Sequence, residues 1–350
     1  SCSQNAQINI VNPLSDSHWD QLVSPHSDFT FFHSSAWLRV ISNTYGHKCF
    51  AFQYYSEGEL KALVPLLEVN SPFTGRRGVC LPFTDFCHPL FFGACNRPRI
   101  FENLCAFARE RGWNHIEFRG KGLTSDATAL PSKTFYGHSL DLQGGVEHLF
   151  AKFKSSVRRA IRRAEERKVD VQFGQSEKAM RQFYGLHLQT RRRHGLPPQP
   201  FGFFQNIHDE ILRRGSGFVC LASSGSKPIA GAVFFHMGKN ATFKFGASDP
   251  QYQDYRSNNL VMWRSIEHLV HNGFENLHLG RTSQSNEGLR RFKLSWATVE
   301  EPLEYFRFNL RTSAWTVSQD RVSGMHNAIF SRLPLALNRI VGTILYPHLD

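Results

Sequence analysis

One pattern of predicted elements occurs twice in this chain, once in each half. Residues 104–118 are expected to form a helix, then a glycine (Gly112) with an aromatic neighbour, then a strand; residues 266–279 repeat this order around Gly273. Glycine is favoured just after a helix, where the chain turns through left-handed backbone angles. Two copies of this helix-to-strand unit predict a duplicated α/β structure.

The same duplication is visible ahead of each unit, where two apolar runs flank a short turn. The expected hairpin strands are 50–55 and 60–69 in the first half, and 218–222 and 229–236 in the second. The turn glycines, Gly58 and Gly225, precede the helix-ending glycines by 54 and 48 residues. The similar spacing favours a duplication over a chance similarity of two α/β segments.

The order of elements in each half resembles the acetyltransferase fold called GNAT. We therefore expect the α/β (α+β) class, with tandem GNAT-like halves and mixed sheets flanked by helices. The expected parts are a first half at 1–150, a basic connecting helix at 151–170, a second half at 171–312 and a C-terminal helical tail at 313–350.

The composition indicates a globular protein with an excess of positive charge. The chain has 350 residues, 41% hydrophobic content and a formal net charge of +12. This charge predicts an anionic partner, such as nucleic acid, a phosphorylated metabolite or an anionic membrane surface; the alternative is a merely soluble basic protein. The seven cysteines form no C-x-x-C, so we expect buried thiols in a reducing, cytoplasmic compartment. No signal peptide or apolar membrane span is recognisable.

The segment 154–168 is predicted to be a basic amphipathic helix. An apolar stripe runs from Val157 to Ala164, arginines and lysines occupy the other faces, and Ser155 or Ser156 is expected to cap the start. So many like charges favour contact with a polyanion about as strongly as a solvated face.

The tail at 333–349 is predicted to be a short amphipathic or docking helix. Arg339 interrupts its apolar residues, and Gly342 is expected to weaken it. The helix either packs on the body of the protein or touches a membrane or a partner. In the second case the chain would be peripheral to the inner membrane.

Motifs of the common enzyme classes are missing from the sequence. G-x-S-x-G, H-E-x-x-H, the Walker A pattern and G-x-G-x-x-G do not occur. His187 and His194 lie seven positions apart on an expected helix, but nothing near them completes a metal site, so no metal is expected.

Two polar segments are candidate sites. Asp85 is the only charge in the apolar run 81–90, so it is either hydrogen-bonded to backbone amides or catalytic. The turn with Arg256, Asn258 and Asn259 leads into a helix whose N-terminal amides suit an anionic donor. Ordinary capping by asparagine is the alternative for this turn.

A third candidate is the segment 277–296, where an apolar strand is expected to stop at Gly280 and open into a polar loop. Its candidate site residues are Arg281, Glu287, Phe292 and Lys293. A fixed cation such as Lys293 is useful where an oxyanion develops during acyl transfer. The alternative is a surface lysine.

Seven segments spread over most of the chain carry a resemblance to a known family. They are HSSAWLRVISNTYGH (33–47), ELKALVPLLEV (59–69), GRRGVCLPFTDFCHPLF (75–91), KSSVRRAIRRAEERKVDV (154–171), FYGLHLQTRRRHGLPPQP (183–200), PIAGAVFFHMG (228–238) and LGRTSQSNEGLRRFKLSWATVEEPLEYF (279–306). They resemble the FemABX family, the aminoacyl-tRNA-dependent peptidyltransferases of peptidoglycan bridge synthesis. More closely, they are similar to FemAB-related, BioF2-like acetyltransferase proteins found near exosortase and exopolysaccharide loci, whose tail resembles PLALNRIVGTIL (334–345).

The resemblance implies a double GNAT fold, with the acceptor in a cleft between the halves and the donor on the second half. It implies that Phe292 and Lys293 match a Phe-Lys pair at the reaction centre, whose lysine stabilises the tetrahedral intermediate. It makes Arg191 and Arg76 candidates for binding acceptor phosphates. The long helical arm of the bridge-forming enzymes is missing, and only the basic helix at 154–168 stands in that region.

We therefore expect an N-acyl or aminoacyl transferase in which an acceptor amine attacks a donor carbonyl. Lys293 would stabilise the oxyanion, Asp85 would orient or deprotonate the amine, and Phe292 would pack on a substrate. No bound cofactor is expected; the anionic partners would be charged tRNA or acyl-CoA as donor and a phosphorylated envelope precursor as acceptor. The alternatives are an acyl-CoA-dependent N-acetyltransferase and a non-catalytic polyanion-binding scaffold.

Overall fold

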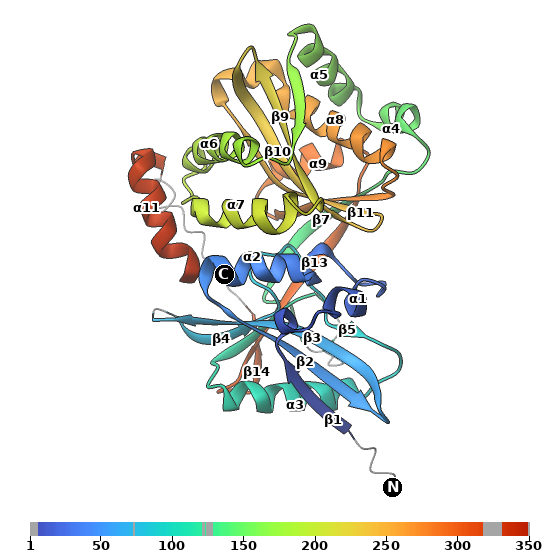
Figure 1. Ribbon diagram of the computed structural model, residues 1–350, viewed down its shortest axis with the longest axis vertical. Helices are drawn as coiled ribbons and strands as arrows, with labels where there is room; N and C mark the ends of the chain where they lie inside the picture. Colours follow the sequence, from blue (N-terminus) through green and yellow to red (C-terminus); the bar gives the residue numbers. More distant parts are fainter. Residues whose placement is uncertain (1–5, 73, 121–122, 124–128, 318–330, 349–350) are drawn as a thin grey trace. The chain divides into compact units, whose positions relative to one another are not determined.

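The computed structural model describes residues 6–72, 74–120, 123, 129–317 and 331–348, which form two compact units (Figure 1). Unit 1 comprises Ser1–Phe135, Pro302–Asp320 and Pro347–Asp350, and unit 2 comprises Tyr136–Glu301 and Arg321–Tyr346. The chain passes from one unit to the other inside two strands, β7 (Lys133–Asp141) and β13 (Val299–Asn309).

Unit 1 is a mixed sheet with helices on its two faces. Its elements are β1 (Ala6–Val11), η1 (Pro13–Ser15), α1 (Trp19–Val23), η2 (Phe31–His33), α2 (Ser35–Tyr45), β2 (Lys48–Ser56), β3 (Glu59–Ser71), β4 (Gly75–Val79), β5 (Leu90–Phe91), α3 (Arg97–Glu110), β6 (His115–Arg119), the end of β13 and β14 (Ala314–Thr316). The strand order is β1-β2-β3-β4-β6-β13, and β4 and β6 are parallel. Helices α2 and α3 lie on opposite faces of this sheet (Figure 1).

Two predictions for the first half are confirmed in unit 1: the β-hairpin, and the glycine that follows a helix and leads into a strand. The β2–β3 hairpin turns through Glu57 and Gly58, whose φ angles of 55° and 78° are both positive. A two-residue turn with two positive φ angles matches the right-handed twist of the paired strands. Gly112, at φ 70°, ends the stretch after α3 and leads into β6.

Unit 2 repeats this architecture with longer helices. Its elements are the rest of β7, α4 (Val146–Lys152), α5 (Ser155–Glu166), β8 (Asp170–Gly174), α6 (Glu177–Arg193), α7 (Phe201–Ile207), η3 (His208–Leu212), β9 (Gly217–Ser224), β10 (Lys227–Met237), β11 (Asn240–Ser248), η4 (Pro250–Tyr255), α8 (Ser257–His271), β12 (Asn276–Ser283), α9 (Glu287–Leu294) and α11 (Leu335–Leu345); η5 (Tyr346–His348) follows α11. The strand order is β7-β12-β11-β10-β9-β8, with β11 and β12 parallel.

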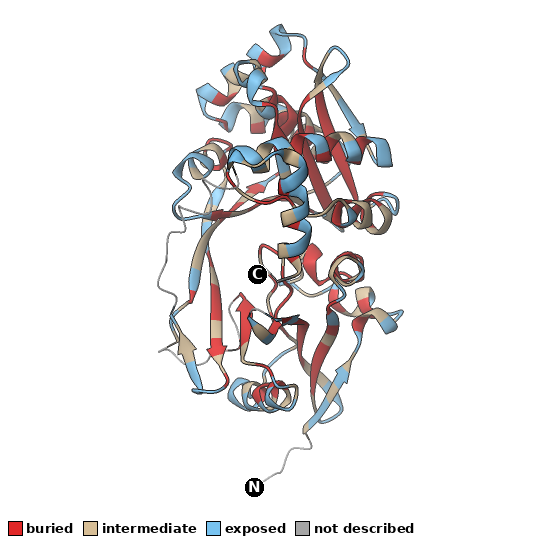
Figure 2. Ribbon diagram, turned by 90° about the vertical axis from the view of Figure 1, so that its left-hand side faces the viewer, coloured by how far each residue is buried: buried red, intermediate tan, exposed pale blue. Residues whose placement is uncertain are grey.

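Alternation along β10 explains how the unit 2 sheet buries both faces. Ala230, Ala232 and Phe234 belong to the core cluster that contains residues of α5 and α8. Between them, Gly231 faces Phe183 of α6, because a Cβ at Gly231 would lie 3.2 Å from that ring. Successive residues of a strand point to opposite faces, so α6 and α8 cover opposite sides. In Figure 2 these strands are largely red, between helices with pale blue outer sides.

The two units differ from the predicted parts at 1–150, 151–170, 171–312 and 313–350. The end of β13 pairs with β6 inside unit 1, with Tyr305 opposite Arg119. A late strand therefore completes the first sheet. A sequence pattern predicts that a strand forms, but the choice of sheet depends on non-local pairing.

The basic segment is part of unit 2 and not a separate connecting helix. Val157, Ile161 and Ala164 of α5 are buried in the same core cluster as α8. The predicted serine cap is wrong, because Lys154 occupies the N-cap position and no side chain caps the helix. Helix α5 is therefore held by its apolar stripe and not by its cap.

The tail helix forms within the predicted range and is continuous through Arg339 and Gly342. Gly342 is buried against Pro198, and its lack of a side chain permits this close packing; the weakening of the helix by glycine stays a prediction. Cys2, one of the seven cysteines, lies outside the described residues, and so do residues 318–330 and 349–350 of the predicted tail. In the described part of the chain, none of the helices is long and apolar enough to cross a membrane.

Candidate active site

The candidate site of unit 2 is built on β12 and α9. The predicted strand end at Gly280 is wrong, because β12 continues to Ser283. Gly280 instead bends the strand locally with a φ of 71°, and its N–H donates to Nδ1 of His278 at 3.0 Å. Glycine allows this backbone conformation at no steric cost. Helix α9 then starts where the side chain of Asn286 accepts a hydrogen bond from the backbone N–H of Leu289 at 3.1 Å.

Lys293 of α9 is buried and points back to the bend in β12. Its Nζ donates to the carbonyl oxygens of Gly280 and Arg281 at 3.0 and 3.1 Å. A buried ammonium is costly unless hydrogen bonds compensate for the lost water, and two carbonyl dipoles provide this here. The alternative of a surface lysine is therefore wrong.

A chain of charged and polar side chains stands beside Lys293, and the sequence did not single it out. Arg290 of α9 donates to both carboxylate oxygens of Glu300 on β13, at 2.8 and 2.7 Å. The same carboxylate lies 2.9 Å from Nε2 of His138, a fully buried residue of β7. Arg290 also lies over the ring of Tyr136, 4.1 Å from its centroid. Three elements of unit 2 thus meet at Glu300.

The contacts among these side chains favour a neutral His138 and an ionised Glu300. The hydrogen bond from Arg290 holds the pKa of the Glu300 carboxyl below its ordinary value. Burial lowers the pKa of His138, and the positive charge of Lys293 lowers it further, against the opposing hydrogen bond to Glu300. Nδ1 of His138 is buried and has no hydrogen-bond partner among the described residues. His138 therefore adds no further positive charge beside Lys293.

The other candidates of this segment lie around α9. Phe292 is half-buried and packs edge-on against Trp296, with ring centroids 6.0 Å apart. Glu287 is exposed in the first turn of α9, 3.7 Å from Arg290. Arg281 offers its backbone carbonyl to Lys293. Roles of Phe292, Glu287 and Arg281 in binding a substrate stay predictions.

The predicted donor turn lies at the start of α8. Arg256 is exposed at the N-cap position with a left-handed φ of 59°, and no side chain caps the helix. Capping by asparagine is therefore wrong; the side chain of Asn258 instead donates to Oγ of Ser248 at 3.2 Å. The N–H of Asn259 donates to the carbonyl of Arg256 at 3.0 Å. Donor binding by this turn stays a prediction.

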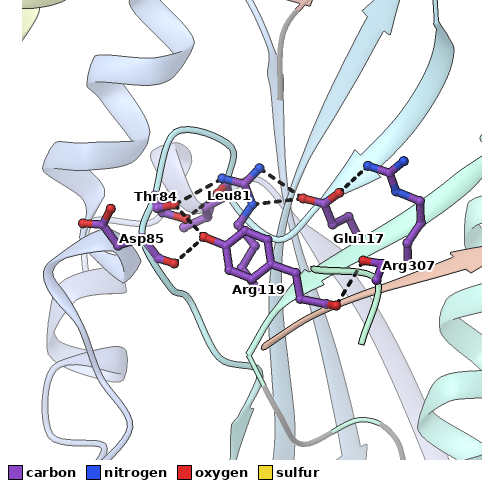
Figure 3. Close-up of polar contacts among 8 residues, drawn as sticks. Leu81, Thr84, Asp85, Glu117, Arg119 and Arg307 are labelled. Carbon is purple, nitrogen blue, oxygen red and sulfur yellow. Dashed lines mark hydrogen bonds and ion pairs between the residues drawn. The ribbon is translucent and has the colours of Figure 1, made fainter. Parts of the chain in front are cut away.

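Asp85 belongs to unit 1, in a loop that is held from two sides (Figure 3). Nη1 of Arg119 donates to the carbonyl of Thr84 at 3.2 Å, and the hydroxyl of Tyr305 donates to the carbonyls of Thr84 and Asp85. The loop contains a left-handed backbone at Leu81, with φ 53°. Figure 3 shows the carboxylate of Asp85 pointing away from Arg119 and Tyr305. These contacts fix the backbone of the loop, and catalysis by its carboxylate stays a prediction.

The buried Arg119 is neutralised within the same unit. Glu117 lies 3.1 Å from Arg119 and 2.7 Å from Arg307. The guanidinium also lies 5.0 Å from the centre of the Tyr305 ring. Arg119 carries no local motif, and Tyr305 was not singled out within the family-like segment 279–306; the signal that could have found them is the pairing of β6 with β13.

The two predicted phosphate-binding arginines make contacts within the protein. Arg191 donates to the carbonyl of Pro197 at 3.0 and 3.1 Å and to the hydroxyl of Tyr346 at 2.7 Å. Arg76 is exposed and donates to the carbonyl of Arg111 at 3.1 Å. The contacts of Arg191 favour a structural role, and phosphate binding by either residue stays a prediction.

Of the two histidines that lie seven positions apart, His187 is on α6 and His194 directly follows the helix. His187 is buried, its Nε2 lies 2.8 Å from Oε1 of Gln199, and burial lowers its pKa to about 3. Among the described residues, no group of three or more His, Cys, Asp or Glu side chains is arranged to hold a metal ion.

Comparison with known proteins gives matches to one domain family and to several solved structures. Residues 151–294 match the family described as acetyltransferase (GNAT) domain. The chain is similar to FemX, with a TM-score of 0.67 and 14% identity over 87% of this chain and 98% of that one. It is also similar to a tandem GNAT protein from the clavulanic acid biosynthesis pathway, with a TM-score of 0.58 and 8% identity over 87% of this chain and 99% of that one. A third similar structure is L-PGS from Bacillus licheniformis, with a TM-score of 0.54 and 14% identity over 91% of this chain and 96% of that one. No curated protein sequence matches this chain.

These matches confirm the predicted fold class of tandem GNAT-like halves with mixed sheets. The matched range runs from the end of α4 to the end of α9 and therefore includes Lys293. An acetyltransferase domain supports the prediction of an acyltransferase. Residues 151–294 thus match the GNAT acetyltransferase domain family, and the chain as a whole has a fold similar to that of FemX.

Proposed function

We propose that the chain is an N-acyl or aminoacyl transferase in which Lys293 stabilises the oxyanion of the tetrahedral intermediate. The observation that carries this proposal is the buried ammonium of Lys293, held by the carbonyls of Gly280 and Arg281 inside a GNAT domain. A cation fixed by buried dipoles needs little reorganisation when negative charge develops.

The proposed reaction is nucleophilic acyl transfer to an amine. The nitrogen of the acceptor attacks the donor carbonyl, the carbonyl oxygen becomes an oxyanion near Lys293, and the ester or thioester bond breaks as the amide forms. The amine must lose a proton during this step. We assign that proton to Asp85, the buried carboxylate of unit 1, as a separate part of the proposal with its own test.

The charge on unit 2 favours a donor that carries phosphates. Arg163 of α5 and Arg167 directly after it are exposed and lie 3.9 and 3.6 Å from Asp254, in the turn ahead of α8. The start of α8 has N–H groups that no side chain caps. Helix N-termini and arginines both bind phosphate groups. Aminoacyl-tRNA and acyl-CoA share this chemistry, and the longer polyanion would extend onto α5.

FemABX-like activity would use a charged tRNA and an amine on a cell-envelope precursor of peptidoglycan or exopolysaccharide. A direct test incubates the purified chain with charged tRNA or with acetyl-CoA, each with a panel of amines that includes phosphorylated envelope precursors. Mass spectrometry then detects the new amide. Amide formation from one donor supports the proposal and identifies that donor.

The matched variant for this test is Lys293→Met, which keeps the length of the side chain without its charge. Loss of amide formation with unchanged donor binding is expected. Salt-sensitive binding of tRNA without amide formation from either donor would instead support the polyanion-binding scaffold and overturn the transferase. Asp85→Asn tests the first unit separately, and an unchanged rate would remove Asp85 from the reaction.

A further inference from the structure

Helix α11 packs on unit 2 by one defined face. Gly342 is buried so closely that a Cβ on it would lie 2.1 Å from the carbonyl oxygen of Pro198. One turn later, the hydroxyl of Tyr346 accepts a hydrogen bond from Arg191 of α6 at 2.7 Å. One turn earlier, Asn338 is buried. Residues 338 and 342 of α11, together with Tyr346 directly after the helix, therefore form its inner face.

The outer face of α11 is an exposed aliphatic stripe. Leu337, Ile340 and Ile344 are 50%, 56% and 60% exposed. Their spacing of three and four residues places them on one side of a helix. Since Gly342 and Tyr346 hold the opposite side of the helix against unit 2, the stripe points away from α6. Exposed aliphatic side chains grouped in this way mark an interaction surface.

The surroundings of the stripe are positively charged. Residues 331–348 contain two arginines, Arg332 and Arg339, both exposed, and no Asp or Glu. Arg192 and Arg193 are exposed at the end of α6, next to the arginine that bonds Tyr346. Aliphatic residues flanked by arginines, without a carboxylate, complement an interface that is apolar inside and anionic at its edge.

We propose that α11 docks on an anionic phospholipid membrane, with Leu337, Ile340 and Ile344 inserted among the acyl chains and the arginines on lipid phosphates. The helix is short and carries no aromatic residue on its outer face, whereas protein interfaces depend mainly on Trp, Tyr and Arg anchors. A short apolar stripe with few cations gives reversible binding, so the chain would exchange between the membrane and solution.

The test uses the full chain and vesicles of two compositions. Vesicles of phosphatidylcholine alone are compared with vesicles that contain about one third phosphatidylglycerol, and bound protein is measured by co-sedimentation. Binding to the anionic vesicles, weakened by salt, is expected for the wild type. The variant with Leu337→Ser, Ile340→Ser and Ile344→Ser is expected to bind about tenfold or more weakly. Leu130→Ser is the matched control, because Leu130 is 59% exposed in unit 1 and is expected to leave binding unchanged.

A second variant tests the charges without touching the stripe. Arg192→Gln with Arg193→Gln and Arg332→Gln is expected to reduce binding and its dependence on salt. Equal binding of wild type and serine variant, or equal binding to both kinds of vesicle, would overturn the proposal. The proposal would also be overturned if the wild type did not bind vesicles but formed a dimer that the serine variant did not form. That result would show that the stripe joins two copies of the chain. None of these measurements depends on the transferase reaction.

Discussion

Replacing Lys293 by methionine tests the oxyanion role most directly. The change removes a buried positive charge that two carbonyl groups hold at 3.0 and 3.1 Å, and it nearly keeps side-chain length. Loss of one donor to an oxyanion costs ~3 kcal/mol in the transition state. Since each ~1.4 kcal/mol changes a rate tenfold, we expect kcat to fall by a factor of about 10²–10³.

The same substitution has a smaller effect on folding. The carbonyls of Gly280 and Arg281 lose a donor, which costs about 1–3 kcal/mol, and removal of a buried charge offsets part of that cost. For a unit of this size, ~1 kcal/mol changes Tm by about 2–4 °C. The variant is therefore expected to remain folded at 25 °C, so its turnover can be measured.

The assay compares amide formation per folded molecule, with donor affinity measured separately. Arg291→Met is the matched control, since Arg291 is an exposed cation on the same helix two positions away. The control is expected to retain turnover and donor affinity. The reasoning is refuted if folded Lys293→Met keeps a kcat within threefold of wild type, or if Arg291→Met loses as much.

Three further predictions concern the surroundings of the site. The pKa of Glu300 is lowered by Arg290, so its stabilising contribution is present above the ordinary pKa of ~4.5 and is lost as pH falls through the lowered value. Between pH 6 and 3, Tm should therefore fall less in Glu300→Gln than in wild type. An equal fall of Tm in both proteins would contradict this. The pKa of His187 is lowered to about 3, so as pH falls the unfolded chain binds a proton at this histidine before the folded chain does. The free energy of unfolding should therefore fall as pH drops below ~6.5. In urea unfolding at two pH values, this free energy should depend less on pH in His187→Phe than in wild type. Gly342→Ala should push α11 off Pro198, and hydrogen exchange in 331–348 that stays as slow as in wild type would exclude this contact.

The sequence was sufficient for features that depend on local rules. Gly112 and Gly273 end helices because their positive φ angles suit glycine, and both were found from the sequence alone. The hairpins followed from apolar runs around Gly58 and Gly225. Lys293 was a candidate from the segment 277–296, and the family resemblance gave it a role, but no local rule distinguishes a buried lysine from an exposed one.

The missed residues depend on contacts between distant segments. His138 and Glu300 meet although they are 162 positions apart, and Arg290 joins them from a third element. Strand β7 carries no motif around His138, and the family-like segment 279–306 contains Glu300 without indicating its partner, so only the sheet pairing reveals the contact. The same limit applies to the unit boundaries, because β13 contributes Glu300 to unit 2 and Tyr305 to unit 1.

The duplication explains why the oxyanion role is assigned to the second unit. The strands β6 and β12 are equivalent in the repeat, and each has a buried cation near its end. In unit 1 this cation is Arg119, whose charge is neutralised by Glu117 at 3.1 Å. In unit 2 it is Lys293, which carbonyl oxygens hold. In the reaction we propose, the two copies of one fold therefore have different tasks: Arg119 holds a loop in unit 1, and Lys293 stabilises the oxyanion in unit 2.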